Sequence, residues 1–148
     1  MKRLLLICCT LMLTLGARAQ GMKDPSTWTM KVVPNSGVYE LVFHVELEPG
    51  WHVWSSNVGG DGMLIPTSVS FEKGSYMIAG GLNESGKIIE TTMDGIDGKV
   101  RYYSGQAEFI QTVKAASGDI VKGEYTYQLC NESMCLPPKT KPFSFSIP

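Results

Sequence analysis

Apolar and polar residues alternate one by one along two stretches of this chain. In residues 38–47 every second residue is apolar, with Val42 as an additional apolar member, and residues 143–147 repeat the pattern. A period of two is typical of a β-strand that buries one face, whereas a helix needs a period near 3.6. No window of a dozen residues keeps the helical spacing. The pattern therefore predicts a protein built from half-buried strands.

Short strand-like segments fill the rest of the chain between turn-forming residues. Glycine, proline, asparagine and aspartate interrupt the apolar stretches at short intervals, as in a β-sandwich. Further strands are expected at residues 51–54, 68–71, 100–103, 107–114 and 123–129, with turns at 80–81, 83–86, 93–98 and 104–105. We predict an all-β, immunoglobulin-like β-sandwich that forms a single domain of residues 20–148, with residues 20–27 as a loose N-terminal arm.

Residues 1–19 have the three parts of a secretory signal peptide. Lys2 and Arg3 give a positive start, residues 4–15 are mostly apolar, and Ala17 and Ala19 occupy the positions that signal peptidase recognises. The apolar run is shorter than the roughly twenty residues that a membrane-spanning helix needs, and no second run of that length follows. We expect cleavage after Ala19, export of residues 20–148, and no membrane span in the mature chain.

The mature chain is weakly acidic, which bears on its partners. Removal of Lys2, Arg3 and Arg18 lowers the count of Lys and Arg from 13 to 10 against 14 Asp and Glu, so the formal net charge changes from −1 to −4. A nucleic-acid partner favours a basic surface, so no nucleic acid is expected to bind. The sequence holds no phosphate-binding loop, Ser/His/Asp set or pair of catalytic carboxylates. We therefore predict no cofactor.

Signal removal leaves two cysteines, Cys130 and Cys135, in an exported and therefore oxidising environment where disulfides persist. In the preceding strand Tyr125, Tyr127 and Leu129 alternate toward the core, so Cys130 continues the outward-facing set. We expect Cys130 to lie near the surface at the end of that strand. The four residues between the cysteines can turn the chain and bring the two Cα atoms to roughly 5–6 Å, as a disulfide requires.

Three functions for this pair follow from the residues alone. A disulfide that closes a ring of six residues contributes about 2 kcal/mol by the chain-entropy argument, less than a long-range bond. A short ring near the surface is open to attack by a partner's thiolate, which favours redox exchange. A structural clip in a non-catalytic, immunoglobulin-like binding module is the main alternative. A metal site would need His44 and His52 as additional ligands, and the cysteine spacing is loose for zinc, so no metal is predicted.

Three segments of the chain resemble one protein family. Residues 127–140, with the sequence Tyr-Gln-Leu-Cys-Asn-Glu-Ser-Met-Cys-Leu-Pro-Pro-Lys-Thr, are similar to the active-site segment of the periplasmic N-terminal domain of DsbD, the bacterial thiol:disulfide interchange protein. Residues 49–54, Pro-Gly-Trp-His-Val-Trp, resemble an early aromatic strand of that family, and residues 98–103 resemble the strand after its cap loop. The likeness covers nearly the whole mature chain in a compatible order.

The resemblance implies a periplasmic, immunoglobulin-like module in which Cys130 and Cys135 cycle between dithiol and disulfide as a protein-disulfide reductase-type component. It implies that a membrane-embedded thiol reductant supplies electrons and that exported thioredoxin-like proteins accept them. It also implies a cap loop that shields the pair until a partner docks, which corresponds by position to residues 92–97. The candidate cap residues are Met93, Asp94, Ile96 and Asp97.

The order in which the cysteines react is open at this point. The family precedent makes Cys135 the cysteine shared with partners, whereas strand parity makes Cys130 the more exposed. The chain also departs from the family, because four residues separate the cysteines where some members have five, and the aromatic cap residue is missing. It ends at Pro148 without a membrane domain or a C-terminal thioredoxin domain, so we expect it to depend on a separate reductant.

Overall fold

The computed structural model describes residues 23–148. The predicted signal peptide, residues 1–19, lies outside the described residues, so its cleavage stays a prediction. None of residues 23–148 lies in a helix long and apolar enough to cross a membrane. In chain order the strands are β1 (Ser26–Asn35), β2 (Val38–Leu47), β3 (His52–Gly59), β4 (Ser68–Phe71), β5 (Met77–Met93), β6 (Ile96–Lys114), β7 (Ile120–Tyr127), β8 (Leu129–Cys130) and β9 (Lys139–Ser146).

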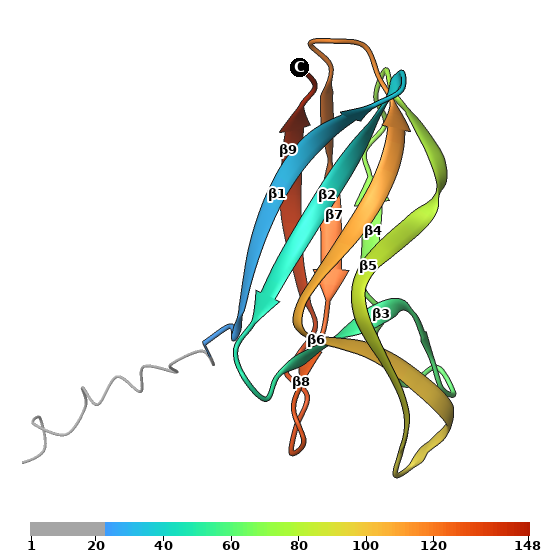
Figure 1. The fold of residues 1–148 in the computed structure, drawn as a ribbon, viewed down its shortest axis with the longest axis vertical. Coiled ribbons are helices and arrows are strands. Elements are labelled where there is room, and N and C mark those ends of the chain that lie inside the picture. Colours follow the sequence, from blue (N-terminus) through green and yellow to red (C-terminus); the bar gives the residue numbers. More distant parts are fainter. Residues whose placement is uncertain (1–22) are drawn as a thin grey trace, which may run out of the picture.

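The strands form two antiparallel sheets that pack face to face (Figure 1). The larger sheet has the order β1-β2-β6-β3-β8, with β5 also paired to β6, and the smaller sheet has the order β4-β7-β9. The long strand β6 pairs first with β3, through residues 100–104, and then with β2, through residues 106–113. It therefore joins the body of the sandwich to an extension of β3, β8 and the first half of β6, at the bottom of Figure 1.

Much of the core between the two sheets consists of residues that the alternation predicts, but Trp28 and Val32 come from β1, a strand that was not predicted. Phe43 of β2 is 1% exposed and contacts Phe143 and Phe145 of β9 at ring-centroid distances of 5.1 and 5.3 Å. Trp28 of β1 packs on Tyr127 of β7 at 4.8 Å. Aromatic pairs of this kind add about 0.5–1.5 kcal/mol each to the gain from burial. The prediction of an all-β, immunoglobulin-like sandwich is confirmed.

Strand β5 contains residues that the sequence indicated as turns. Residues 80–81 and 83–86 lie inside β5, where the pairing with β6 shifts register after Ala79 and after Gly86. Gly80 and Gly86 have φ angles of 70° and 139°, which glycine adopts readily. Residues added at such shifts bend a strand without ending it, as β-bulges do. The predicted turns are wrong for this reason, and the turn predicted at residues 104–105 likewise lies inside β6.

The predicted loop at residues 93–98 is a tight hairpin between β5 and β6. Met93 pairs with Ile96, so only Asp94 and Gly95 form the turn. Of the two turn residues only the second needs a positive φ angle, which glycine adopts readily. Gly95 has a φ of 80°. The candidate cap residues therefore lie on a hairpin, with a register shift between Thr92 and Met93, and not on an open loop.

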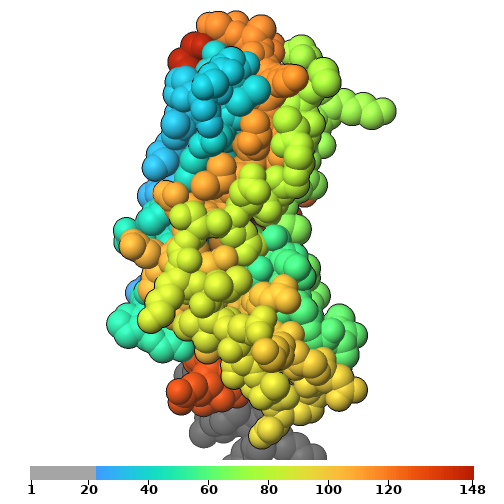
Figure 2. Space-filling model, turned by 45° about the vertical axis from the view of Figure 1, so that its right-hand side comes forward, coloured from blue at the N-terminus to red at the C-terminus, as the bar shows by residue number. Residues whose placement is uncertain are grey.

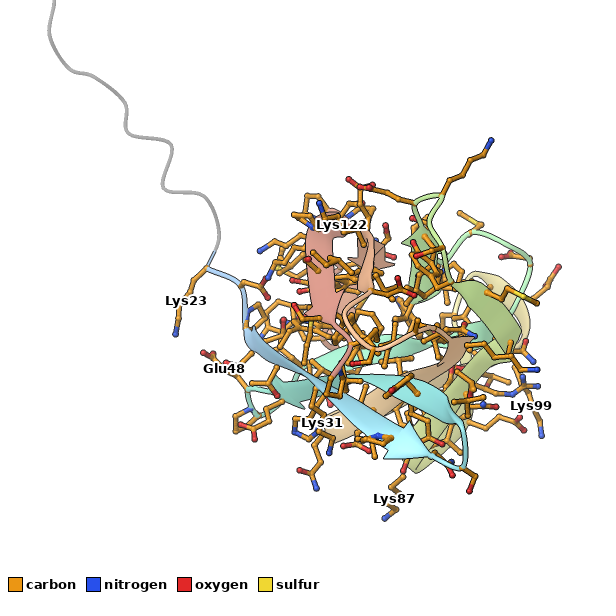
Figure 3. The ribbon with its side chains drawn as sticks, turned by 90° about the horizontal axis from the view of Figure 1, so that it is seen from above. Lys23, Lys31, Glu48, Lys87, Lys99 and Lys122 are labelled. Carbon is orange, nitrogen blue, oxygen red and sulfur yellow. A yellow bond between two sulfur atoms is a disulfide. The ribbon has the colours of Figure 1, made fainter. Side chains whose placement is uncertain are left out.

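Exposed lysines lie on several sides of the molecule. Lys23 forms an ion pair with Glu48 at 2.9 Å, and Figure 3 shows both side chains at one edge. Isolated surface pairs of this kind contribute about 0–1 kcal/mol. Other lysines that point outward in the same view are Lys31, Lys87, Lys99 and Lys122.

The N-terminal segment is tied to the smaller sheet through Asp24. Its carboxylate accepts hydrogen bonds from the hydroxyls of Ser26 and Tyr127, both at 2.6 Å, and forms ion pairs with Lys139 and Lys141 at 3.1 and 3.2 Å. Burial alone would raise the pKa of Asp24, but these hydrogen bonds hold it well below its usual range. The predicted loose arm is therefore wrong for residues 23–27, while residues 20–22 lie outside the described part.

Asp24→Asn is expected to lower the free energy of unfolding by about 1.5–3 kcal/mol at pH 7, the usual contribution of hydrogen bonds to a charged group. Because the pKa of Asp24 is lower in the folded than in the unfolded protein, this stabilisation is present above the unfolded value of about 3.9 and is lost as the pH falls through the folded value. In urea unfolding, the difference in free energy of unfolding between wild type and Asp24→Asn should be smaller at pH 3 than at pH 7. Equal losses in Asp24→Asn and in the exposed control Glu124→Gln would contradict this assignment.

Candidate functional site

Cys130 and Cys135 form a disulfide at one end of the molecule. Their Cα atoms are 4.0 Å apart, closer than the expected 5–6 Å. The two residues lie directly opposite each other in an antiparallel bridge and do not exchange backbone hydrogen bonds, the arrangement in which opposite Cα atoms approach most closely. The flanking backbone hydrogen bonds run from Asn131 to Met134 at 2.9 Å and from Leu136 to Leu129 at 2.8 Å.

A short turn carries the chain from one cysteine to the other. The side-chain oxygen of Asn131 accepts hydrogen bonds from the backbone N–H groups of Ser133 and Met134, both at 2.9 Å. Asparagine side chains commonly hold turns in this way. None of these contacts uses a sulfur atom, so they all stay available when the disulfide is reduced.

The two cysteines differ in accessibility. Cys130 is 0% exposed, whereas Cys135 is exposed. The prediction that Cys130 lies near the surface is wrong, although its strand parity was read correctly. Leu129 belongs to the core between the sheets, while Cys130 lies on the opposite face and belongs to a second hydrophobic cluster. The other residues of the second cluster cover that face, so Cys130 is buried although it lies outside the core between the sheets.

The second cluster is the small core of the extension. It brings together strand β3, strand β8, the loop after β3 and the hairpin of β5 and β6. Figures 1 and 2 show the β5–β6 hairpin and the disulfide turn at the same end of the molecule. The buried members are Trp54, Val58, Leu64, Val100 and Cys130, and the partly buried side chains packed against them are Met93, Ile96 and Tyr102.

The candidate cap residues divide into two pairs. Met93 and Ile96 pack against the second cluster, to which Cys130 belongs, whereas Asp94 and Asp97 are exposed. Gly60 permits this packing, because a Cβ atom at that position would come within 2.9 Å of the Ile96 side chain. The structure thus brings the two apolar residues to the site, and their function as a cap stays a prediction.

Apolar side chains are exposed around Cys135. The adjacent Met134 is 42% exposed, and Ile65 is 36% exposed. Gln128 links these two segments, because its side chain accepts a hydrogen bond from the N–H of Ile65 at 3.3 Å and donates one to the carbonyl of Leu136 at 3.2 Å. A shallow hollow lined by residues 49–51 and 131–133 lies beside the disulfide turn. Cys135 therefore lies on a surface that a partner can approach.

His52 lies next to Cys130, a placement that the sequence analysis missed. The two residues are paired across strands β3 and β8. The imidazole packs on the rings of Tyr102 and Trp54, with centroids at 4.3 and 4.8 Å. Burial lowers the pKa of His52 to about 4, so the ring is neutral at physiological pH. No local motif indicates this contact, because β8 follows His52 by more than seventy residues. The two segments meet only through the pairing of β3 with β8.

Residues 18–147 match the family described as thiol:disulfide interchange protein DsbD, N-terminal. The chain belongs to this family. No curated protein matches the sequence significantly.

Two solved structures are similar to this member of the DsbD N-terminal family. The N-terminal periplasmic domain of ScsB from Proteus mirabilis superposes with a TM-score of 0.63 at 15% identity, over 84% of this chain and 47% of that chain. At this identity the similarity supports the fold, and the chain spans about half the length of the ScsB structure. The N-terminal domain of Neisseria meningitidis DsbD in the reduced form gives a TM-score of 0.43 at 19% identity, over 80% of this chain and 84% of that chain.

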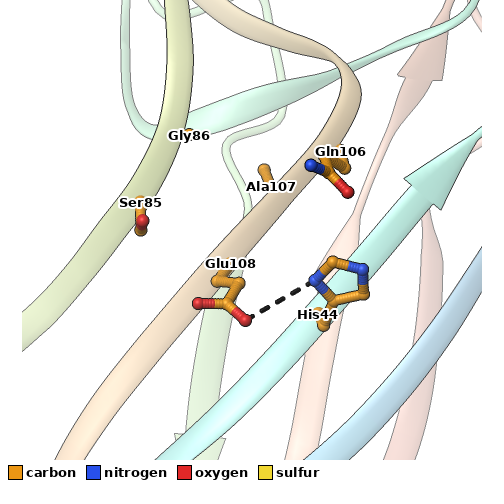
Figure 4. Close-up of a pocket in the computed structure, with 6 residues that line it drawn as sticks. All are labelled: His44, Ser85, Gly86, Gln106, Ala107 and Glu108. Carbon is orange, nitrogen blue, oxygen red and sulfur yellow. Dashed lines mark ion pairs between the residues drawn. The ribbon is translucent and has the colours of Figure 1, made fainter.

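The other histidine of this DsbD-family domain lies elsewhere. His44 of β2 forms ion pairs with Glu46 and Glu108, both at 3.6 Å, and it lines a shallow hollow with Ser85 and Gln106 (Figure 4). The metal site considered from the sequence needs His44, His52 and both cysteines together. Residues 23–148 contain no group of three or more His, Cys, Asp or Glu side chains that could hold a metal.

A partly buried carboxylate attaches strand β5 to the extension of this DsbD-family domain. Glu84 accepts hydrogen bonds from the hydroxyl of Ser55 at 2.8 Å, the backbone N–H of Ser56 at 2.5 Å and the hydroxyl of Tyr103 at 2.7 Å. Burial, together with the neighbouring carboxylate, raises the pKa of Tyr103. Residues 83–86 were predicted as a turn, and the sequence does not indicate this role of Glu84, because Ser55 and Ser56 lie 29 and 28 residues away in the chain.

Proposed function

We propose that this chain is an exported thiol–disulfide exchange module in which Cys130 and Cys135 cycle between disulfide and dithiol. The observation that carries the proposal is the difference between the two cysteines, one buried and one exposed, within a ring of six residues. Such a pair offers a partner a single accessible sulfur and protects the other. Membership of the DsbD N-terminal family supports the same chemistry.

Exchange proceeds through mixed disulfides. In the reduced protein the thiolate of Cys135 attacks a sulfur of the partner's disulfide, and the partner's other sulfur leaves as a thiolate. Cys130 then attacks the Cys135 sulfur, which restores the Cys130–Cys135 bond and releases the second partner thiolate. Two electrons pass from the module to its partner. The reverse sequence, starting with attack of a donor's thiolate on Cys135, reduces the module again.

The partners proposed are exported thioredoxin-like proteins as acceptors and a membrane-embedded thiol reductant as donor, as the family implies. The location proposed is the periplasm. It is supported by the signal-peptide pattern of residues 1–19 and by the periplasmic origin of the similar ScsB domain. We further propose that Met93 and Ile96 cover Cys130 as the apolar part of the cap, with Asp94 and Asp97 forming its exposed edge.

The reduction potential separates this proposal from a binding module with a structural clip. Structural disulfides of secreted proteins have potentials below about −300 mV, whereas exchange sites lie above that value. We expect the Cys130–Cys135 couple to lie above about −300 mV in a titration against dithiothreitol or glutathione, followed by alkylation of the free thiols and mass measurement. The Cys130→Ser/Cys135→Ser variant gives the baseline. A potential well below about −300 mV would support the clip and reject exchange.

A further inference from the structure

Two buried ring nitrogens in residues 23–148 lack a hydrogen-bond partner, and both belong to β3 residues on the face of the sheet that carries Cys130. They are Nε2 of His52 and Nε1 of Trp54. Buried polar groups are almost always hydrogen-bonded, and exceptions often mark sites where chemistry needs them. Trp54 belongs to the second cluster with Cys130, and its ring packs against His52 at 4.8 Å.

The pairing of the strands puts His52 and Cys130 on the same face of the sheet. They are directly opposite residues of β3 and β8, and such residues have Cβ atoms about 4.5–5.5 Å apart. Tyr102 and Trp54 hold the imidazole from two sides, with centroids at 4.3 and 4.8 Å. The ring is therefore fixed beside Cys130, with an unpartnered nitrogen in a buried position.

Cys130 needs a proton acceptor in order to take part in exchange. The thiolate is the reacting form of cysteine, and burial in apolar surroundings disfavours it. Cys130 is 0% exposed, so water has little access to its thiol. A neutral imidazole within reach would take up the proton, and the resulting imidazolium would stabilise the thiolate as an ion pair.

We propose that His52 accepts the proton of the Cys130 thiol when Cys130 attacks the mixed disulfide. This inference rests on the proposed exchange function and assigns a residue to its second step. The Cys130 thiol transfers its proton to Nε2 of His52, and the thiolate attacks the Cys135 sulfur. The Cys130–Cys135 bond forms, the bond between Cys135 and the partner breaks, and the partner leaves as a thiolate. The imidazolium then gives its proton to solvent.

The other groups around His52 are compatible with this role. In the disulfide form burial lowers its pKa to about 4, so the ring is neutral but a weak base. In the dithiol form the negative charge that develops on the Cys130 sulfur beside it favours the imidazolium and so makes proton acceptance possible. The titratable neighbours facing it are Tyr102 on β6 and Cys130 on β8. On β5, Met93 contributes an apolar side chain, and Glu84 is bound to Ser55 and Tyr103 on the opposite face.

The test uses reduced full-length mature protein and dithiobisnitrobenzoate as the disulfide substrate. Wild type should release two thionitrobenzoate ions per protein, the first on attack by Cys135 and the second on attack by Cys130. His52→Phe keeps an aromatic ring against Trp54 and removes the proton acceptor. We expect the first phase to be unchanged and the second to slow at least about tenfold at pH 7, since general bases typically contribute 10²–10⁴-fold.

The pH profile provides a readout that packing alone would not move. The second phase in His52→Phe should recover at alkaline pH, where the Cys130 thiol ionises without help. His44→Asn, which changes the other histidine, should match wild type at every pH. If His52→Phe fails to fold, His52→Gln provides the same comparison with a polar side chain that does not titrate.

The possible outcomes separate this inference from the function on which it rests. Identical second phases in wild type and a folded His52 variant, at all pH values, would overturn the role of His52 and leave exchange intact. Release of a single thionitrobenzoate ion by wild type would instead overturn the exchange function itself. A second phase that slows equally at every pH would show a packing effect and also reject proton acceptance.

Discussion

Cys130→Ser is expected to trap mixed disulfides through Cys135, whereas Cys135→Ser is expected to react with partner disulfides at least about 100-fold more slowly. The thiolate is the nucleophile, and Cys135 is exposed while Cys130 is 0% exposed. Burial in apolar surroundings disfavours the thiolate, so only a small fraction of Cys130 is in the reactive form at neutral pH. Lack of access to a bulky partner slows Cys130 further.

The measurement compares the two single-cysteine variants directly. Each is reduced and treated with iodoacetamide and with dithiobisnitrobenzoate, and the rate of thiol loss is followed. A thermal unfolding curve for each variant shows that both are folded. Equal rates for the two variants would mean that the buried position of Cys130 does not govern the order of attack.

A third variant tests the proposed cap within the same experiment. In the Cys135→Ser background, Ile96→Ala removes a side chain that packs against the second cluster. We expect the remaining thiol, Cys130, to react faster with iodoacetamide than it does without the Ile96 change. Ile120→Ala, an exposed substitution on β7, is the matched control and should leave the rate unchanged. No difference between these two variants would exclude Ile96 from the cap.

Glu84→Ala is expected to lower the free energy of unfolding by about 2–4 kcal/mol. The change leaves the hydroxyls of Ser55 and Tyr103 and the N–H of Ser56 without their acceptor. A fully buried donor left unsatisfied costs about 1–3 kcal/mol, and since the Glu84 site is only partly buried, water replaces part of the loss. Ser55 is 1% exposed, so water compensates poorly at that position. Since the lost contacts join β5 to β3, hydrogen exchange should rise in the β5–β6 hairpin as well.

A neighbouring carboxylate on the same strand provides the control for Glu84. Glu90 pairs with Lys99 and Arg101 at 2.8 and 3.1 Å, but it lies on the surface. Exposed ion pairs contribute about 0–1 kcal/mol, so Glu90→Ala should cost much less than Glu84→Ala in urea unfolding. If both variants lose the same free energy, the partly buried hydrogen-bond network is not what attaches β5 to the extension.

Local patterns predict the strands well and predict the breaks between them less well. The alternation of residues 38–47 identifies β2 and its buried face, because period two leaves a strand only one consistent apolar side. The turns predicted within residues 80–86 are wrong because glycine and asparagine favour both turns and bulges. A bulge forms in place of a turn where a partner strand continues alongside. Here β6 continues alongside β5 on both sides of the register shifts.

In the N-terminal segment, local patterns likewise fail to predict the contacts of a polar residue. Residues 23–27 lack an alternating pattern and resemble an arm, yet Asp24 is held by Tyr127 and Lys141 of the smaller sheet. These partners lie more than a hundred residues away in the chain. No local signal distinguishes an aspartate that has such partners from one that is solvated.

The strand class, the cysteine pair and the face of the strand on which Cys130 lies could all be predicted from the sequence. These properties depend on the types and spacing of nearby residues. The tertiary structure alone decided that this face is buried, because the β5–β6 hairpin and β3 cover it. It also decided that His52 lies opposite Cys130, through a pairing of distant strands. Burial and cross-strand contacts depend on which distant segments pack together, and local periodicity does not encode that choice.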